Sequence, residues 1–233
     1  MLGQLPTAPE PKGPSPSLSS NHGTDTRTYL RAVFNDAQKL WRGEFKAAGQ
    51  QYTPARLTIF SGAVNSSGCG AQQDVGPFYC GANHRIYLDL RFLDGLTNRF
   101  GIGAFAQAYV VGHEFGHHIQ TITGILQRRA AADQQDPAGR NARSVRFELQ
   151  ADCLAGVWAH SVYKRGEISE ADINQALKAA QLIGDDFQQH VSGNAVDSAM
   201  WTHGSSAQRQ RWFTTGFEKG DPGGCDTFSV ATV

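Results

Sequence analysis

The sequence lacks an excess of charge of either sign, and it also lacks any long apolar run. Lysine plus arginine and aspartate plus glutamate both total 21 in the 233 residues, so the formal net charge is zero. Without a basic stripe the chain has no electrostatic footprint of nucleic-acid binding, which excludes that class of partner. No stretch reaches the roughly 18 apolar residues of a membrane span, and the N-terminus lacks the charged-then-apolar layout of a signal peptide. We therefore expect no membrane span in this chain.

Cysteine is scarce, and no two cysteines form a Cys-x-x-Cys pair. The four cysteines are Cys69, Cys80, Cys153 and Cys225. The missing pair argues against a thiolate zinc site and against a thioredoxin-type redox site. An even number of cysteines, two of them close together in the chain, suits disulfides in an oxidising compartment.

The composition divides the chain into a tail and one domain. Residues 1–26 are rich in proline, serine and glycine and hold almost no large apolar side chain. Such a segment buries too little surface to offset its ordering entropy, so we predict a flexible tail or linker there. Residues 27–233 are long enough for one well-buried core but short for two. We predict a single folded domain over 27–233.

Hydrophobic periodicity predicts a mainly helical α+β domain with a small sheet in its N-terminal half. Helical spacing of apolar residues, with capping residues at some of the starts, covers 27–48, 92–100, 104–123, 144–164, 169–188 and 205–218. Residues 55–61 and 85–90 have the pattern of strands. The alternation of apolar and polar residues in 85–90 predicts a half-exposed strand. The polar segment 132–141 is predicted to be a loop.

The pentapeptide HEFGH at positions 113–117 lies within one of these helices. Residues four apart on a helix differ by about 40° in direction, so His113 and His117 can direct two imidazoles at one ion. This spacing predicts a zinc site. Glu114 lies one step round the helix, where it can take a proton from a water that the metal acidifies. The neighbouring His118 points about 100° away, so we expect it behind the ligands or in the core.

A catalytic zinc site needs a third protein ligand and leaves one position open for water. Glu148 and Asp152 are also four apart, on a predicted helix and among apolar neighbours. Glu148 could bind the metal, while Asp152 could accept the free ring N–H of a ligand histidine and fix its tautomer. The alternative is that both carboxylates lie on a solvated helix edge.

Hydrolysis also needs a donor that stabilises the oxyanion of the tetrahedral intermediate. His203 lies just before the last predicted helix and Arg209 lies on it, so both are candidate donors. The alternative is a surface histidine and a solvated arginine.

Six segments resemble the bacterial putative neutral zinc metallopeptidase family. They are GPFYC (76–80), IYLDL (86–90), AQAYVVGHEFGHHIQ (106–120), FELQADCLAGVWA (147–159), IGDD (183–186) and THGSSAQRQRWFTTGF (202–217). The resemblance runs from roughly residue 55 to 228, about three quarters of the chain. It implies a zincin fold whose third metal ligand is a glutamate.

The resemblance implies a role for each candidate residue. His113, His117 and Glu148 would bind zinc, Glu114 would be the catalytic base, and Asp152 would be the partner of a ligand histidine. The last segment is also similar to that of the CAAX-prenyl endopeptidases, where a histidine and an arginine at this spacing serve the transition state. That similarity strengthens the assignment of His203 and Arg209 as donors.

The family also implies disulfides Cys69–Cys80 and Cys153–Cys225. Many members carry an N-terminal membrane anchor that faces outward from the cytoplasm, whereas this chain starts with a segment rich in proline and serine. We expect an extracytoplasmic location: periplasmic, secreted or anchored by a segment absent from this chain.

The sequence therefore predicts a zinc-dependent endopeptidase of peptides or proteins. We expect the substrate to lie antiparallel along an edge strand at 85–90, where Tyr87, Leu88 and Asp89 would contact it. One alternative is a non-catalytic zinc-binding or interaction module, against which the intact Glu114 argues. A second alternative is a zinc amidase that acts on cell-wall peptide.

Overall fold

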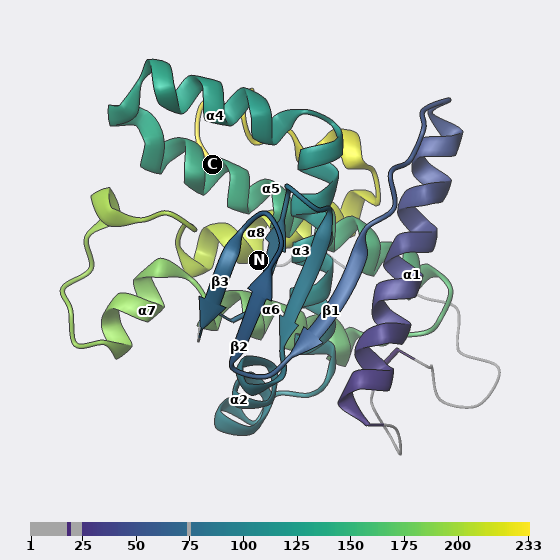
Figure 1. Cartoon of the computed structure of the whole chain (residues 1–233). Coiled ribbons are helices and arrows are strands. Elements are labelled where there is room, and N and C mark those ends of the chain that lie inside the picture. The colour runs from purple at the N-terminus through teal and green to yellow at the C-terminus, as the bar shows by residue number, and fades with distance from the viewer. Residues whose placement is uncertain (1–17, 20–24, 74–75) are drawn as a thin grey trace.

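The computed structural model describes residues 18–19, 25–73 and 76–233 of the chain. Figure 1 shows a layer of strands in front of a group of helices, with α1 (Thr26–Ala47) standing beside β1 (Arg56–Phe60). The other α-helices are α2 (Leu90–Phe100), α3 (Phe105–Ile122), α4 (Ile125–Gln135), α5 (Arg140–Lys164), α6 (Glu170–Leu182), α7 (Asp185–Val191) and α8 (Ser206–Lys219). Short 3₁₀ turns cover Pro137–Gly139, Ser198–Met200 and Pro222–Cys225. The predicted mainly helical α+β fold is confirmed.

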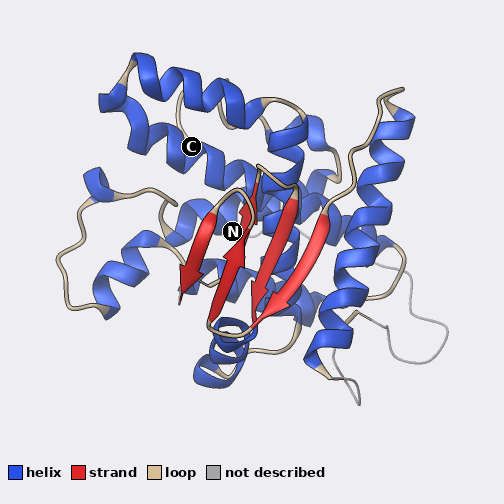
Figure 2. Cartoon of the chain, viewed as in Figure 1, coloured by secondary structure: helices blue, strands red, loops and turns tan. Residues whose placement is uncertain are grey.

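The strands form two small groups in the N-terminal half (Figure 2). The three-stranded sheet has the order β1–β5–β4, in which β5 (Arg85–Asp89) pairs with β1 in parallel and with β4 (Phe78–Cys80) antiparallel. The remaining two strands, β2 (Ala63–Ser66) and β3 (Gly70–Gln73), form a hairpin. Strand β4 is therefore an edge of the three-stranded sheet, and β5 is its centre.

The position of β5 corrects the prediction of a half-exposed edge strand. Tyr87, Leu88 and Asp89 are each exposed by 3% or less. Their polar groups have partners inside the protein, because the Tyr87 hydroxyl accepts a hydrogen bond from Nδ2 of Asn83 and Asp89 accepts one from the backbone N–H of Gly62. The ring of Tyr87 also stacks on Phe78 at 4.6 Å. Both neighbouring strands already use the hydrogen-bonding edges of β5, so a substrate cannot pair with it.

Helix α3 is the centre of the fold and lies antiparallel to α5. Gly116 of the HEFGH segment allows this close approach, because a Cβ there would lie 2.6 Å from Cα of Ala151. Gly112, one turn earlier, faces Ala155 and Trp158 at 3.1–3.4 Å in the same way. The two glycines let one face of α5 pack directly on one face of α3. Side chains on these two faces can therefore contact each other.

Helix boundaries differ from the prediction in the C-terminal half. Residues 125–135 are helical where a loop was predicted from residue 132, and α5 begins at Arg140, four residues early. The predicted helix 169–188 is two helices, because Gly184 is extended and opens α7. A Cβ at Gly184 would lie 2.4 Å from the backbone nitrogen of Ser206. The break therefore lets the start of α7 contact the loop before α8.

The predicted tail 1–26 lies mostly outside the described residues. Leu18 and Ser19 are described and belong to the fold: Leu18 is buried, and Tyr29 donates a hydrogen bond to its carbonyl oxygen. Ser19 donates to a carboxylate oxygen of Asp172 at 2.8 Å. These two residues contact the folded domain, and the flexible tail over 1–26 stays a prediction.

Two disulfides join the pairs that the family resemblance implied. Cys69–Cys80 ties the β2–β3 hairpin to β4, and Cys153–Cys225 ties α5 to the last 3₁₀ turn. None of the helices in the described part of the chain has the length and apolar character that a membrane crossing requires.

Candidate metal centre

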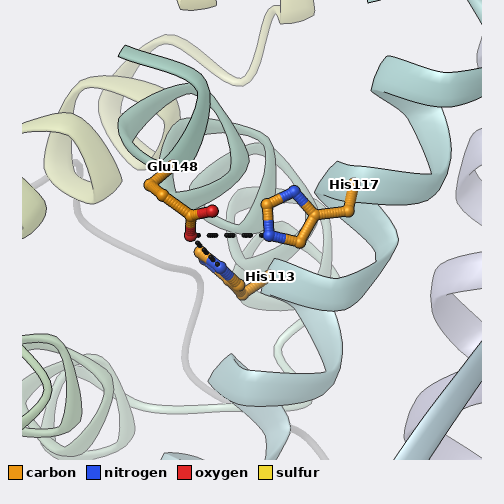
Figure 3. A group of neighbouring side chains, drawn as sticks. All are labelled: His113, His117 and Glu148. Carbon is orange, nitrogen blue, oxygen red and sulfur yellow. Dashed lines mark hydrogen bonds and ion pairs between the residues drawn. The ribbon is translucent and has the colours of Figure 1, made fainter. Parts of the chain in front are cut away.

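His113 and His117 on α3 and Glu148 on α5 direct their polar atoms at one point (Figure 3). The same oxygen, Oε2 of Glu148, lies 3.1 Å from Nε2 of His113 and 3.5 Å from Nε2 of His117. One donor atom from each of the three residues lies within 4.8 Å of the others. Residues four apart on α3 share a face, and the close approach of α5 supplies the third donor.

The second nitrogen of each histidine has its own acceptor. Nδ1 of His113 lies 2.7 Å from Oδ1 of Asp152, and Nδ1 of His117 lies 2.9 Å from Oε1 of Gln120. Gln120 is fixed in turn, because its amide nitrogen donates to the carbonyl oxygen of Phe147 and to Gln150. These acceptors place the ring proton on Nδ1 and leave the lone pair on Nε2, as a metal ligand requires.

Asp152 is fully buried and forms hydrogen bonds with His113 and with two further side chains. Arg209 donates from Nε and Nη2 at 2.8 and 3.0 Å, and the hydroxyl of Tyr109 donates at 2.6 Å. Burial alone would raise the pKa of Asp152, but the charges of Arg209 and His113 outweigh it and hold that pKa at about 2. Asp152 is therefore ionised and fixed behind His113.

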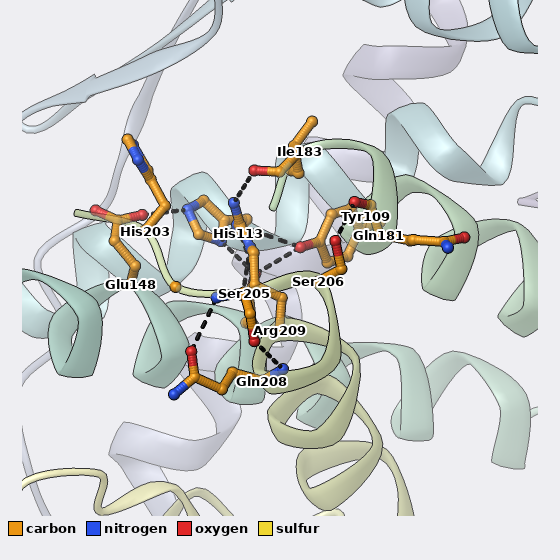
Figure 4. A network of polar contacts seen from close by, with 12 residues as sticks. Tyr109, His113, Glu148, Gln181, Ile183, His203, Ser205, Ser206, Gln208 and Arg209 are labelled. Carbon is orange, nitrogen blue, oxygen red and sulfur yellow. Dashed lines mark hydrogen bonds and ion pairs between the residues drawn. The ribbon is translucent and has the colours of Figure 1, made fainter. Parts of the chain in front are cut away.

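Arg209 is buried behind the ligands, although it borders the cavity. Figure 4 shows its guanidinium reaching from α8 towards Ile183, Tyr109 and His113. Its side chain is 3% exposed, and Nη1 donates to the carbonyl oxygen of Ile183 at 3.2 Å. With its donors turned to Asp152 and Ile183, Arg209 is better placed to hold Asp152 than to meet a substrate.

Glu114 borders the same cavity, and its carboxylate is incompletely satisfied. The residue is 6% exposed, and no hydrogen-bond partner among the described residues meets its buried Oε2. Burial raises the pKa of Glu114, although His117 and His113 act in the opposite direction. An unpartnered buried carboxylate oxygen costs free energy, and this one belongs to the residue that directly follows the ligand candidate His113.

His203 lies on the Glu148 side of this group (Figure 4) and is oriented by Asp185 of α7. Nδ1 of His203 lies 3.2 Å from Oδ1 of Asp185, while the other carboxylate oxygen accepts from the backbone nitrogens of residues 202, 203 and 204. The hydrogen bond to Asp185 raises the pKa of His203 above its ordinary value of 6.5. The ring is half exposed, so Nε2 is available to a ligand in the cavity.

These groups open on one cavity of about 700 Å³. It is bordered by α3, β4, the start of α4, α5 and the 202–203 loop. Its apolar lining residues are Pro77, Phe78, Phe92, Val110, Leu126, Phe147 and Ile183. Tyr87, Leu88 and Asp89, the predicted substrate contacts, are not among the lining residues, whereas Phe78 and Tyr79 of β4 are.

The sequence had not indicated Tyr109, Gln120 or Asp185. Tyr109 and Gln120 lie four residues before and three residues after a ligand histidine, on the same helix. That spacing was the available signal for both. Asp185 belongs to the IGDD segment, which marked the family but suggested no role. His118 is in the core, where its Nε2 bonds to the carbonyl oxygen of Thr53 and burial lowers its pKa to about 4.

The donor set fits a catalytic zinc ion. Two imidazole nitrogens with one carboxylate oxygen form a three-ligand set that leaves a coordination position open. Glu114, one of whose carboxylate oxygens has no hydrogen-bond partner among the described residues, lines the same cavity. A purely structural zinc site would close the fourth position with a protein ligand. The residues present therefore match the open kind of site.

The chain is similar to known proteins over most of its length. Residues 5–228 match the family described as "Putative neutral zinc metallopeptidase". The "Uncharacterized protein YpfJ" of Escherichia coli K12 is 41% identical over 215 residues, which cover 91% of this chain and 74% of that protein. The "Uncharacterized protein Rv2575" of Mycobacterium tuberculosis H37Rv is 46% identical over 228 residues, covering 91% and 75%. No solved structure matches the chain.

The match includes the two helices that carry the histidines and the glutamate, together with the loop that carries His203. The chain thus belongs to the Putative neutral zinc metallopeptidase family.

Proposed function

We propose that the protein is a zinc-dependent endopeptidase that hydrolyses peptide bonds. The observation that carries the proposal is the position of Glu114, whose buried, incompletely satisfied carboxylate borders the cavity beside three converging ligand atoms. A site that only stored or displayed a metal would have no use for this carboxylate. His113, His117 and Glu148 would hold the zinc.

Zinc in such a site lowers the pKa of a bound water and polarises the substrate carbonyl group. Glu114 accepts the proton of the attacking water and passes it to the leaving amine. Burial, which raises the pKa of Glu114, suits a group that must both take and release a proton. Asp152 and Gln120 keep the two imidazoles in the orientation that directs Nε2 at the metal.

His203 is the proposed donor to the oxyanion. Its ring is half exposed at the cavity, and Asp185 both orients it and favours its protonated form. A protonated imidazole stabilises negative charge that develops on the carbonyl oxygen. Arg209, proposed from the sequence for the same task, acts by holding Asp152.

Strand β4 takes the place of β5 as the proposed edge for the substrate. Among the described strands it pairs with β5 alone, and its residues Phe78 and Tyr79 line the cavity. An extended peptide that added to this edge would place its backbone beside Glu114. The largely apolar lining favours peptides with uncharged side chains around the scissile bond.

An extracytoplasmic location is part of the proposal. Two disulfides join all four cysteines of the chain. Such bonds persist in oxidising compartments and are rare in the cytosol.

A digest of casein and of a peptide library tests the proposal. We expect internal cleavage that a chelator abolishes and that added zinc restores. The variant Glu170→Gln, which removes an exposed carboxylate of α6, should cleave as the wild type does. No cleavage by the zinc-loaded protein would favour the non-catalytic module.

The amidase alternative needs a separate substrate. Purified peptidoglycan is incubated with the protein, and the released products are identified by mass spectrometry. An endopeptidase leaves the amide bond between glycan and peptide intact. Release of whole peptide stems from the glycan would replace our proposal with an amidase.

A further inference from the structure

The cavity extends along α3 in both directions from the metal ligands. Val110, Glu114, His117 and Thr121 all line it. These positions are four, three and four residues apart, so they lie on one face of the helix. Eleven residues of helix rise by about 16 Å, which is enough for several residues of an extended peptide. The cavity therefore has one end near Val110 and another near Thr121, on opposite sides of the ligands.

The end near Thr121 is closed by Gly81 after β4 and by Leu126 of α4. A Cβ on Gly81 would lie 3.1 Å from Cδ2 of Leu126 and 3.6 Å from the side chain of Thr121. All three residues line the cavity, together with Phe147. The three segments thus converge on a small space one helical turn beyond His117.

This end of the cavity offers apolar groups and no free charge. The hydroxyl of Thr121 donates to the carbonyl oxygen of His117, so it is already satisfied. Leu126 is half-buried and Phe147 is stacked on the ring of His117 at 5.1 Å. Arg129, whose guanidinium lies 4.7 Å from the centre of the Phe147 ring, does not line this cavity and pairs with Asp133.

The charged residues that line the cavity are elsewhere. They are the metal-ligand group with Glu114, the Asp185–His203 pair and the buried Arg209, which is bonded to Asp152. A charged substrate side chain at the Thr121 end would lose its hydration without gaining a partner. An aliphatic side chain there would bury apolar surface without leaving a charge unpaired.

We propose that Leu126, with Gly81 and Thr121, forms a specificity subsite that selects an uncharged aliphatic side chain next to the scissile bond. The subsite rests on the proposed peptidase function and extends it, since it names the class of substrate. Leu126 determines the preference because it is the side chain that closes the space opposite Gly81. The protein is then selective for peptides with residues such as leucine or valine on one side of the cleaved bond.

The variant Leu126→Lys tests the subsite by inverting its preference. A half-buried leucine near the start of α4 can be exchanged for lysine without unfolding the core, because α4 has no buried residues. The matched control is Ile125→Lys, which adds the same charge to the same helix one residue earlier. Ile125 lines a separate cavity formed with α5 and the last 3₁₀ turn.

The measurement uses zinc-loaded protein and quenched fluorescent peptides that vary at one position at a time among Leu, Asp and Lys. We expect the wild type and Ile125→Lys to prefer Leu over Asp by at least tenfold in kcat/KM at one position beside the scissile bond. In Leu126→Lys, the ratio of kcat/KM for the Asp peptide to kcat/KM for the Leu peptide at that position should rise at least tenfold. An unchanged ratio, or the same change in Ile125→Lys, would overturn the subsite.

A binding measurement separates failure of the subsite from failure of the proposed function. The same labelled peptides are titrated into the Glu114→Gln protein, with and without Leu126→Lys, and fluorescence anisotropy is followed. If the wild type cleaves nothing, the peptidase proposal fails. The subsite still stands if Leu126→Lys inverts the binding preference between the Asp and Leu peptides, and it fails if that preference stays the same.

Discussion

At the scale of single residues, each ligand histidine is held by one buried oxygen. Asp152 serves His113 and Gln120 serves His117, so the two rings depend on acceptors of different charge. Gln120 belongs to α3, like the histidine that it contacts. Asp152 belongs to α5 and accepts hydrogen bonds from Arg209 and Tyr109. The orientation of the metal ligands is therefore built from within the core, away from the cavity.

Replacing Gln120 by methionine tests this support. The change keeps the volume but removes the acceptor from Nδ1 of His117, so we expect zinc to bind about 10–100-fold more weakly. Competition with a chromophoric chelator measures the zinc dissociation constant. The control Gln127→Met changes an exposed glutamine of α4 and should leave the constant unchanged. Equal zinc affinity in the two variants would show that Gln120 does not position His117.

Asp185 provides a prediction about pH. Its hydrogen bond raises the pKa of His203, so His203 stays protonated above pH 6.5 and loses its proton as the pH rises through the raised pKa. If protonated His203 stabilises the oxyanion, activity falls over that alkaline range. Asp185→Asn removes the negative charge, lowers the pKa of His203 and should move the fall in kcat/KM to lower pH. A profile of kcat/KM against pH detects the shift.

The control for this profile is Asp197→Asn, which changes an exposed carboxylate that accepts only from its own 3₁₀ turn in the described structure. We expect its alkaline limb to match that of the wild type. An alkaline limb in Asp185→Asn that also stays at the wild-type pH would contradict the role assigned to the protonated ring.

At the scale of elements, the contact between α3 and α5 decides whether the metal ligands meet. A Cβ on Gly116 within the HEFGH segment would lie only 2.6 Å from Cα of Ala151. Any side chain there separates the two helices and moves Glu148 and Asp152 away from the histidines. This explains why a glycine stands directly before His117 in the segment.

Gly116→Ala should therefore lower both stability and zinc affinity. Overpacking of this kind costs about 1–3 kcal/mol of unfolding free energy. The control Gly95→Ala lies in the exposed part of α2 with no atom within 4 Å of the added Cβ, so it should stabilise by about 0.5–1 kcal/mol. Urea denaturation of both variants measures the difference. A Gly116→Ala protein as stable as wild type would show that the helices can separate at little cost.

The sequence predicted those parts of the fold that depend on local spacing. Helices α1, α2, α3 and α8 follow the apolar periodicity closely, and the two histidines are four apart whatever the rest of the chain does. The capping residues predicted at helix starts include Ser169 and Ser205, and each of them forms a capping box within four consecutive residues.

The prediction failed mainly where the conformation or burial of a residue depends on residues distant in sequence. Tyr87 and Asp89 alternate with apolar residues as in a half-exposed strand, yet Phe78 and the backbone of Gly62 cover them. Helix α4 has no buried residues, so no apolar stripe indicated it. Asp185 gains its role from backbone nitrogens of residues 202–204, which are 17 to 19 residues away in sequence. Gln120 is different, because it lies three residues after His117 on the same helix and its spacing was a signal that the prediction did not use.

At the scale of the whole molecule, the Cys153–Cys225 disulfide joins α5, which carries two residues of the site, to the C-terminal segment. Cys153 follows Asp152 directly, and its bond to Cys225 holds the last 3₁₀ turn against α5. Gln150 reinforces this contact by donating to the carbonyl oxygen of Cys225 at 3.0 Å. The C-terminal segment is thereby fixed to the helix that carries Glu148.

The two disulfides should contribute unequally to stability. Cys153 and Cys225 are 72 residues apart in sequence, whereas Cys69 and Cys80 are 11 apart. Loop-closure entropy predicts that the disulfide stabilises the folded state by about 4 kcal/mol for the longer loop and by about 3 kcal/mol for the shorter. Replacing each pair by serine and measuring thermal unfolding should show the larger loss for Cys153 and Cys225. The reverse order would contradict the entropic account.

The most direct test of the central claim is the activity of the Glu114→Gln variant with its bound zinc measured on the same sample. The substitution removes the proton acceptor but none of the three metal ligands. We predict full zinc occupancy with a loss of peptide hydrolysis of several orders of magnitude. Substantial hydrolysis by the zinc-loaded variant would contradict the mechanism.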